Sequence, residues 1–180
     1  MNIETAIDNI LAVEKGYVDH AADRGGPTNW GVTEVVARQN GYTGSMRDMP
    51  QAFARGVYRK RYITEPLFDR VAVLTAPVAM ELIDTGVNMG PQVAATFLQR
   101  WLNGFNSTGS YYADLFVDGR LGNASLAALG AFLKWRGKEG ETALLRALNS
   151  IQGTRYLDIA ERDRSQRAFL FGWVMNRVEM

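Results

Sequence analysis

The chain has 180 residues, of which 47% are hydrophobic and 22% are charged, and its formal net charge is +1. This composition is typical of a folded globular protein, and so weak a charge argues against nucleic-acid binding, which needs a concentrated basic surface. There is no cysteine and only one histidine, His20, which excludes a disulfide scaffold, a cysteine nucleophile and a zinc site. We therefore expect an enzyme of this composition to move protons with carboxylates, without a metal or cofactor.

The first predicted element is a helix over residues 3–15, which Gly16 is well placed to end in a left-handed conformation. Its apolar side chains recur at the helical offsets i, i+4, i+7 and i+8, at Ile3, Ile7, Ile10 and Leu11. From residue 23 to residue 33 the pattern changes to glycines, proline and short polar residues around Trp30. This change predicts a turn or hairpin, the one β element that we expect.

The rest of the chain is predicted to be helical, so the fold class is mainly α with a small β-hairpin. Periodicity indicates further helices at about 34–40, 50–62, 76–89, 92–104 and 123–136, and a long one within 141–175. In the last of these we expect Tyr156, Ile159, Phe169 and Trp173 to point inward. Residues 104–119, rich in Gly, Ser, Asn and Tyr, are the best candidate for a linker between subdomains.

Membrane and export signals are not evident in the sequence. No apolar run reaches the length of roughly 18 residues that a membrane span needs. The start, Met1-Asn2-Ile3-Glu4, lacks the basic region and apolar stretch of a secretory signal. We expect synthesis in the cytoplasm without a signal peptide, and no stable membrane insertion.

Glu14 is the most informative carboxylate. It follows Ile10, Ile7 and Ile3 by four, seven and eleven residues, which places it within about 40° of each on a helix. An acid on an apolar face is desolvated, and desolvation raises its pKa so that it keeps a proton for general-acid catalysis. The alternative is that Glu14 lies at a frayed helix end and is solvated.

The glycine-rich turn that follows offers the groups that a sugar polymer needs. Thr28 and Asn29 supply hydrogen bonds for a water molecule or an acetamido group, and Tyr17 and Trp30 supply flat surfaces on which a pyranose ring stacks. Each has a structural alternative, since Trp30 is more often a core residue and such turns are common. The combination favours a glycan-cleaving site.

These motifs resemble those of glycoside hydrolase family 108, the N-acetylmuramidases found among bacteriophage endolysins. Residues 14–17, Glu-Lys-Gly-Tyr, are similar to the family signature Glu-Gly-Gly-Tyr, with a lysine in place of the first glycine. Residues 23–33, Asp-Arg-Gly-Gly-Pro-Thr-Asn-Trp-Gly-Val-Thr, resemble its continuation. Further matches follow in order at residues 58–62, 84–90, 98–102, 118–122, 171–173 and 176–178. The last third resembles the family's peptidoglycan-binding region.

The resemblance implies a lysozyme-like helical fold with a small β-hairpin, divided into a catalytic region at 1–90 and a helical peptidoglycan-binding region at 91–180 packed on it. It places the catalytic glutamate at Glu14. The spacing to Asp23 and Thr28 is similar to the Glu–Asp–Thr set of phage-type lysozymes, with the threonine one residue early. Asp19 and Glu34 are the rivals of Asp23 for the second acid, and Asp23 also suits a turn-capping role.

The predicted substrate-binding residues extend beyond the turn. They are Tyr17, Asp19, Asn29, Trp30, Tyr62, Asp84 and Asn88. Asp84 and Asn88 lie four residues apart on one predicted helix face, and the alternative for Asp84 is a buried hydrogen bond that joins two helices.

The implied function is hydrolysis of the β-1,4 bond between N-acetylmuramic acid and N-acetylglucosamine in peptidoglycan glycan strands. The alternatives are a non-catalytic peptidoglycan-binding module and a helical partner-binding protein. The resemblance covers both endolysins, which reach the wall through a holin, and muramidases of protein export such as typhoid-toxin release, which use another translocation pathway. We expect action in the periplasm or at the cell wall.

Overall fold

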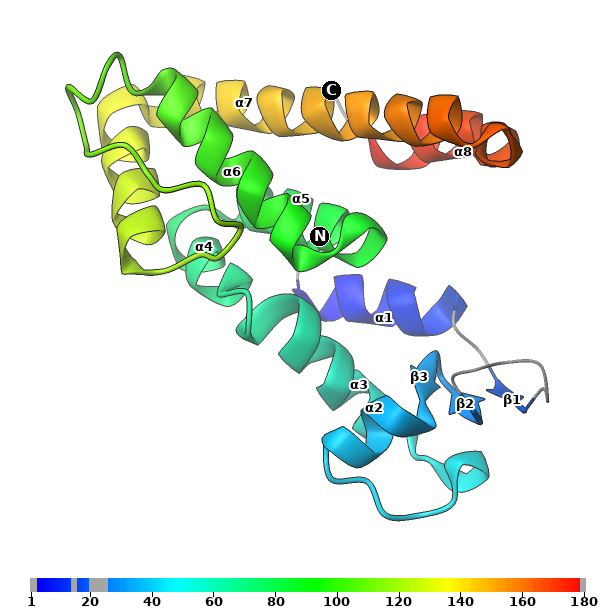
Figure 1. Cartoon of the computed structure of the whole chain (residues 1–180). Coiled ribbons are helices and arrows are strands. Elements are labelled where there is room, and N and C mark those ends of the chain that lie inside the picture. Colours follow the sequence, from blue (N-terminus) through cyan, green and yellow to red (C-terminus); the bar gives the residue numbers. More distant parts are fainter. Residues whose placement is uncertain (1–2, 14–15, 20–25, 179–180) are drawn as a thin grey trace. The chain divides into compact units, whose positions relative to one another are not determined.

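The computed structural model describes residues 3–13, 16–19 and 26–178. The chain folds into two compact units, residues 1–65 and residues 66–180. The N-terminal unit contains one longer helix, a small sheet and several short helices, and the regular elements in the described part of the C-terminal unit are all helices (Figure 1). Each unit has its own buried apolar side chains. The fold is therefore mainly α with one small sheet, as predicted.

Helix α1 (Ile3–Val13) confirms the first predicted helix. Ile7 and Leu11 are buried, and Ile3 is half-buried, so the predicted apolar stripe faces the interior. Gly16 has φ +100°, the left-handed conformation expected after the helix. Helix α1 packs against α3 (Gln51–Arg59), and Arg55 of α3 forms an ion pair with Glu4 of α1. Glu14 lies outside the described residues.

The sheet has three strands in the order β1-β2-β3, all antiparallel. Strands β2 (Thr28–Asn29) and β3 (Val32–Thr33) form the predicted hairpin, and β1 (Tyr17–Val18) is an additional strand. The β2–β3 loop consists of Trp30 and Gly31, both with positive φ, at 52° and 73°. Positive φ at both loop positions is the type I′ arrangement, which matches the twist of a two-residue hairpin but is rare for a bulky residue.

The rest of the N-terminal unit surrounds this sheet. Helix α2 (Glu34–Gln39) follows β3 directly, and the Thr33 hydroxyl caps it by accepting a hydrogen bond from the Val36 amide at 3.4 Å. The 3₁₀ helix η1 (Met46–Asp48) contacts β2. Helix α3 continues into the π-helical turn η2 (Lys60–Thr64), so the predicted helix over 50–62 changes its hydrogen bonding near its end.

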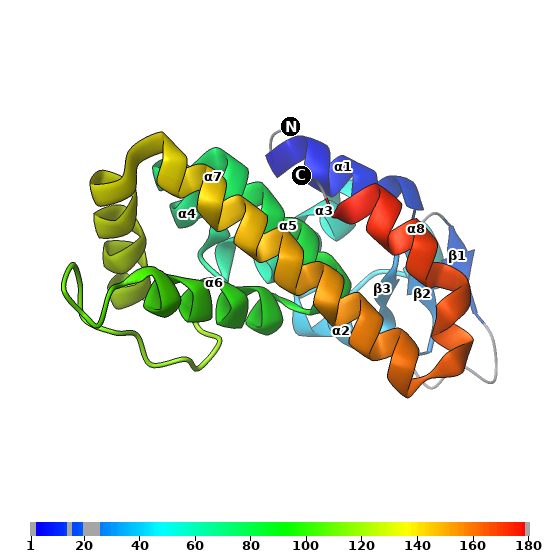
Figure 2. The same ribbon diagram turned by 90° about the horizontal axis from the view of Figure 1, so that it is seen from above.

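The C-terminal unit is built on α5 (Ala76–Met89), which contacts α4 (Phe68–Leu74), α6 (Pro91–Phe105) and α7 (Asn123–Arg162). Figure 2 shows α7 running across α5 and α6. Helices α5 and α6 confirm the predicted spans, whereas α4 was not predicted. The main buried apolar side chains are Phe68, Leu82, Ile83, Leu98, Leu102, Leu129, Phe132, Leu144 and Leu148.

Helix α7 combines two predicted elements. Gly137, at φ 57° and ψ −144°, breaks the helical backbone, and the segments before and after it run in different directions (Figure 1). The chain then forms the 3₁₀ turn η3 (Arg164–Gln166) and α8 (Arg167–Arg177). Of the residues expected to point inward, Tyr156 is buried, and Ile159 and Trp173 are half-buried. Phe169 is 57% exposed, so that prediction was wrong for it.

The sequence suggested that residues 104–119 link two subdomains. In the structure these residues fold within the C-terminal unit. Amide side chains of α6 and of Asn106, the residue that follows it, hold this segment. Gln99 accepts a hydrogen bond from the Gly119 amide at 2.9 Å and donates one to the Arg120 carbonyl at 3.1 Å. Asn103 bonds the backbone of Leu115, and Asn106 bonds that of Tyr112. Long-range amide contacts thus replace the flexibility that the composition suggested.

Replacing Gln99 tests this anchoring. Gln99 is 2% exposed, and Gln99→Ala leaves the Gly119 amide and the Arg120 carbonyl without their buried partner. We expect a loss of about 2–4 kcal/mol in the free energy of unfolding, measured by urea titration. Gln51→Ala, at an exposed position of α3, is the control and should change stability by less than about 0.5 kcal/mol. Equal effects of the two changes would contradict the anchoring role.

Candidate functional site

The predicted site residues fall in both compact units. Glu14 and Asp23 lie outside the described residues, so their roles stay predictions. Of the others, Tyr17, Asp19, Thr28, Asn29, Trp30 and Tyr62 belong to the N-terminal unit, and Asp84 and Asn88 belong to the C-terminal unit.

Strand β1 presents an exposed polar and aromatic edge. The Tyr17 hydroxyl donates a hydrogen bond to Asp19 Oδ2 at 3.0 Å, and the Arg47 guanidinium lies 4.6 Å from the centre of the Tyr17 ring. The hydrogen bond to Asp19 is the main cause that raises the pKa of Tyr17. Asp19 is exposed and has no ion pair among the residues that the structure describes. Its carboxylate is thus held by a neighbour and open to solvent.

The sheet register places this edge beside the turn residues. Tyr17 pairs with Asn29, and Val18 pairs with Thr28, which on its other side pairs with Thr33. Thr28 is half-buried, and its hydroxyl donates a hydrogen bond of 3.3 Å to the Gly26 carbonyl. Since a hydroxyl oxygen that donates still accepts, Thr28 keeps the capacity to bind another donor.

Asn29 holds the sheet in place. Its side chain is 5% exposed, and its Nδ2 donates to the carbonyls of Met46 and Arg47 at 2.8 and 3.1 Å. Both hydrogens of the amide therefore bind η1, the helix that carries Arg47. The predicted substrate contact of Asn29 is untested, but the structure gives this residue a structural role.

Trp30 is fixed from two sides. Its indole Nε1 donates to the Met49 carbonyl at 3.1 Å, and its own carbonyl accepts from the Tyr58 hydroxyl at 3.2 Å. These contacts stabilise the positive φ that its side chain disfavours. The ring is half-buried, so part of its surface remains available for a sugar ring.

Glu34 is the other candidate for the second acid among the described residues. Unlike Asp19, it forms an ion pair. Its Oε1 lies 2.7 Å from Arg38 Nη2 in an ion pair one helical turn away. Arg38 is itself held by the carbonyls of Tyr42 and Gly44. The ion pair occupies one oxygen of Glu34 and offsets its charge, so this carboxylate is less available to stabilise positive charge or to activate water.

Tyr62 lies on η2 and is half-buried. Its ring stacks on Tyr58 with the ring centres 5.9 Å apart, and the Arg61 guanidinium lies 5.4 Å from the ring centre. Tyr62 therefore belongs to an aromatic pair of the N-terminal unit.

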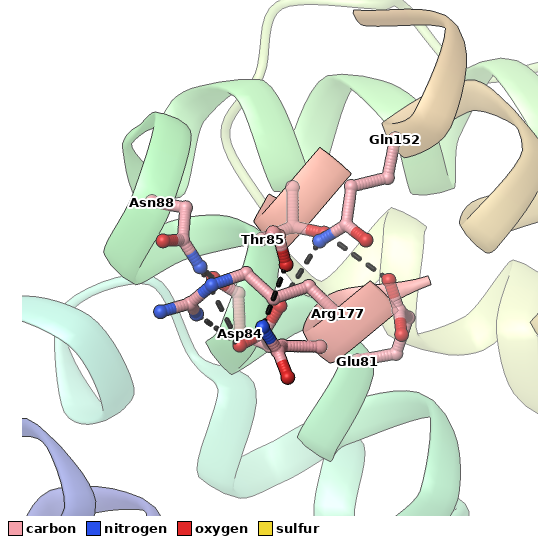
Figure 3. Close-up of polar contacts among 8 residues, drawn as sticks. Glu81, Asp84, Thr85, Asn88, Gln152 and Arg177 are labelled. Atoms are coloured by element: carbon pink, nitrogen blue, oxygen red, sulfur yellow. Dashed lines mark hydrogen bonds and ion pairs between the residues drawn. The ribbon is translucent and has the colours of Figure 1, made fainter. Parts of the chain in front are cut away.

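Asp84 joins three helices of the C-terminal unit (Figure 3). One carboxylate oxygen lies 2.7 Å from Nη1 of Arg177 on α8, and the other accepts from Nε2 of Gln152 on α7 at 3.0 Å. Asn88, one turn along α5, donates to the Asp84 carbonyl at 2.7 Å and to its carboxylate at 3.4 Å. These contacts agree with the alternative in which Asp84 joins helices by hydrogen bonds, although its side chain is 36% exposed and not buried. The predicted substrate contacts of Asp84 and Asn88 are untested.

A second layer of polar groups extends from this junction. Gln152 also donates to the Thr85 hydroxyl, which in turn donates to Glu81, and Asn149 donates to the other oxygen of Glu81. Burial, followed by the charge of Asp84, raises the pKa of Tyr156 to about 12. The side chains of this network thus connect α5, α7 and α8 through charge and amide contacts.

The sequence did not indicate Arg47 or Gln152 as members of these clusters. The signal for Arg177 was its place in the family-like stretch at residues 176–178. A contact such as Asp84–Arg177, between residues far apart in the chain, follows only from tertiary packing.

The described part of the chain offers neither a metal-binding cluster nor a membrane-spanning helix. No group of three or more His, Asp or Glu side chains is placed there to hold a metal ion. No helix within residues 3–13, 16–19 and 26–178 has the length and apolar character needed to cross a membrane.

Comparison with known proteins gives the class of the molecule. Residues 7–90 match the family described as Glycosyl hydrolase 108, and residues 93–178 match the one described as Predicted Peptidoglycan domain. The structure of Brucella abortus SagA is similar over 95% of this chain and 94% of its own, with 23% identity and a TM-score of 0.53, which supports the fold. No curated protein matches the chain.

The two family matches indicate a glycoside hydrolase that acts on peptidoglycan, and its fold is mainly helical. The glycosyl hydrolase match lies in the first half of the chain, and the match to a peptidoglycan domain lies in the second half.

The amide of Asn29 provides a test of how the sheet is held. Asn29→Asp replaces a buried donor with an acceptor that faces the carbonyls of Met46 and Arg47. We expect a loss of about 3 kcal/mol in the free energy of unfolding, measured by urea or thermal denaturation. The same change at Asn176, an exposed residue of α8, is the control. Equal stability of the two variants would contradict the anchoring role of Asn29.

A double-mutant cycle tests the Asp84–Arg177 pair. The two side chains are 36% and 35% exposed, so solvent screens the attraction, and we expect a coupling of about 1 kcal/mol between Asp84→Asn and Arg177→Gln. Urea unfolding of the single and double variants measures the coupling energy, and additive effects would contradict the coupling.

A loss of hydrolysis in Asp84→Asn that Arg177→Gln does not share would support substrate contact by Asp84.

Proposed function

We propose that the chain hydrolyses the β-1,4 bond between N-acetylmuramic acid and N-acetylglucosamine, with Glu14 as general acid. The main support is the glycosyl hydrolase match over residues 7–90, which includes Glu14, Asp23 and the whole sheet. The apolar face of α1, with Ile7 and Leu11 buried, adds physical support, because Glu14 continues the helical spacing of that face.

In the proposed reaction Glu14 donates its proton to the glycosidic oxygen as the bond breaks. The sugar that remains develops positive charge at its anomeric carbon, and a carboxylate on the opposite side either stabilises this charge or activates water. We assign this second role to Asp23, with Thr28 orienting the water molecule. The free acceptor capacity of the Thr28 hydroxyl supports this assignment.

Asp19 is the alternative second carboxylate. It is exposed, it lacks an ion pair within the described residues, and the hydroxyl of Tyr17 fixes its direction. Glu34 is less suitable, because Arg38 holds its carboxylate. The separation between Glu14 and the second acid determines whether the enzyme retains or inverts the anomeric configuration.

The proposed substrate contacts are aromatic and polar. Tyr17, which pairs with Asn29, and Trp30, which follows Asn29, offer aromatic rings, with Tyr62 as a further aromatic group. Asp19 and Asn29, with Asp84 and Asn88 of the C-terminal unit, are assigned to the hydroxyl and acetamido groups of the glycan. The exposure of the Tyr17–Asp19 edge supports its part in this assignment.

We further propose that the protein acts in the periplasm or at the cell wall, where its substrate is located. Synthesis in the cytoplasm and release through a holin suit phage-type lysis, and another translocation pathway suits a role in protein export. Peptidoglycan hydrolysis supports both roles equally.

Glu14→Gln tests the proposed acid. An amide has no proton to donate, and loss of general-acid catalysis typically lowers the rate by roughly 10²–10⁴. We expect a reduction of that order in the release of reducing ends from purified cell walls, with unchanged thermal stability. Glu161→Gln, an exposed glutamate of α7, is the matched control. Wild-type activity in folded Glu14→Gln would refute the assignment.

The same assay separates the enzyme from a non-catalytic wall-binding module. Mass spectrometry of the soluble fraction identifies muropeptides with new reducing muramic acid ends. If the wild-type protein sediments with walls and releases no such products, it is a binding module. If it neither sediments nor releases products, a helical partner-binding protein is favoured.

A further inference from the structure

Helices α6 and α7 of the C-terminal unit line an open groove of about 520 Å³. Each helix contributes one face, since the lining residues recur at helical offsets on both. The residues are Gln92, Val93, Thr96, Phe97 and Arg100 from α6, and Ile151, Thr154, Arg155 and Asp158 from α7. The volume lies within the range of roughly 300–1,000 Å³ that is usual for ligand sites. We call it the α6/α7 groove.

The groove contains two arginines whose charge is not used by the fold. Neither Arg100 nor Arg155 has a hydrogen bond or ion pair within the described residues, whereas Arg177 of the same unit is bound to Asp84. Arg100 is exposed and Arg155 is half-buried. One comes from each wall, so an anion between the helices would meet guanidinium groups from both sides. Guanidinium groups bind carboxylates with charge-assisted and often bidentate hydrogen bonds.

The remaining lining residues restrict the kind of anion. Val93, Phe97 and Ile151 provide apolar surface, and Phe97 is 7% exposed. Asp158 adds a negative charge one helical turn from Arg155. An all-anionic ligand, such as a polyphosphate or a phosphodiester polymer, would leave Asp158 without a group of opposite charge. A ligand with carboxylates, one ammonium group and small apolar groups matches all these features.

The threonines add neutral hydrogen-bonding capacity. The Thr96 hydroxyl donates to the Gln92 carbonyl at 2.8 Å, and the Thr154 hydroxyl donates to the Ser150 carbonyl at 2.9 Å. Because each hydroxyl hydrogen is engaged in these bonds, each oxygen is left to accept a hydrogen bond from an N–H group of a ligand. Peptide amides supply such donors.

We propose that the α6/α7 groove binds the peptide stems of peptidoglycan, with Arg100 and Arg155 on stem carboxylates and Asp158 on the ammonium group of the diamino acid. This inference rests on the proposed action on peptidoglycan. It assigns a site to the half of the chain that matches a peptidoglycan domain. The neutral glycan backbone carries no charges for these three residues, whereas the peptide stem carries both signs and the alanine methyl groups that suit the apolar surface.

Direct binding tests the chemistry with the wild-type protein alone. The probe is a synthetic stem tetrapeptide, L-Ala–γ-D-Glu–meso-diaminopimelate–D-Ala, titrated by calorimetry and by amide NMR. We expect resonances of the residues that line the groove to shift, and binding to weaken at least about tenfold when the carboxylates of the peptide are amidated. Equal binding of both peptides, shifts confined to other residues, or no binding would overturn the proposal.

The arginines are tested by Arg100→Gln and Arg155→Gln, singly and together. Loss of one charge-assisted hydrogen bond should weaken peptide binding by about tenfold for each variant. Arg162→Gln, the same change at an exposed position of α7, is the matched control and should bind as the wild type does. If the double variant unfolds, the amidated peptide gives the same answer without any substitution. Normal binding by a folded double variant would overturn the proposal.

A comparison of substrates separates this site from the catalytic one. On intact walls the double variant should release fewer reducing ends than the wild type. On glycan strands whose stems have been removed by an amidase, the two should be equal. If the wild type releases reducing ends but does not bind the peptide, the groove proposal fails and the muramidase proposal stands. If the peptide binds and no reducing ends appear, the muramidase proposal fails and the groove proposal stands. Binding of a polyglycerol phosphate in place of the peptide would show an anionic-polymer site instead.

Discussion

The N-terminal unit depends on one buried amide, that of Asn29. A sheet of two-residue strands has too few ladder hydrogen bonds to be stable alone, so its position must come from outside the sheet. Asn29 supplies it by donating to two successive carbonyls of η1, and Trp30 and Tyr58 secure the adjoining turn. The exposed Tyr17–Asp19 edge, opposite Asn29 and Thr28, is therefore presented by a rigid support.

Buried amide side chains also stabilise the C-terminal unit, where they connect helices and an irregular segment and not a sheet. Gln99 fixes an irregular segment of the chain, and Gln152 reaches the carboxylate that joins three helices. Both glutamines are almost fully buried, where an amide that lost its partners would be costly. Burial thus converts side chains that look like ordinary surface polar groups into specific connections between elements. The face of α7 that carries Gln152 serves this junction, and a neighbouring face lines the α6/α7 groove.

The sequence predicted those parts of the fold that depend on local signals. Helix α5 was predicted over its full length from its periodicity, and in the structure its ends are defined by the Thr75 cap and by Gly90, at φ 96°, after its last residue. Helix α4 was missed because it has only seven residues and follows Leu67, which has a left-handed backbone and no capping hydrogen bond. The positive φ of Trp30 could not be predicted either, because no local signal in the sequence indicates it. Its cause lies in contacts with Met49 and Tyr58, which are far away in the chain.

The boundaries given by sequence and by packing do not coincide, and α5 shows why. The glycosyl hydrolase match extends to residue 90, whereas the compact unit that contains α5 begins at residue 66. Leu82 and Ile83 of α5 are buried in that unit, and Asp84 binds Gln152 and Arg177 there. A chain cut after residue 90 would expose this apolar surface and leave Asp84 without those two partners. Residues of α5 that match the hydrolase family by sequence therefore pack with helices that match the peptidoglycan domain, which couples the two matched regions physically.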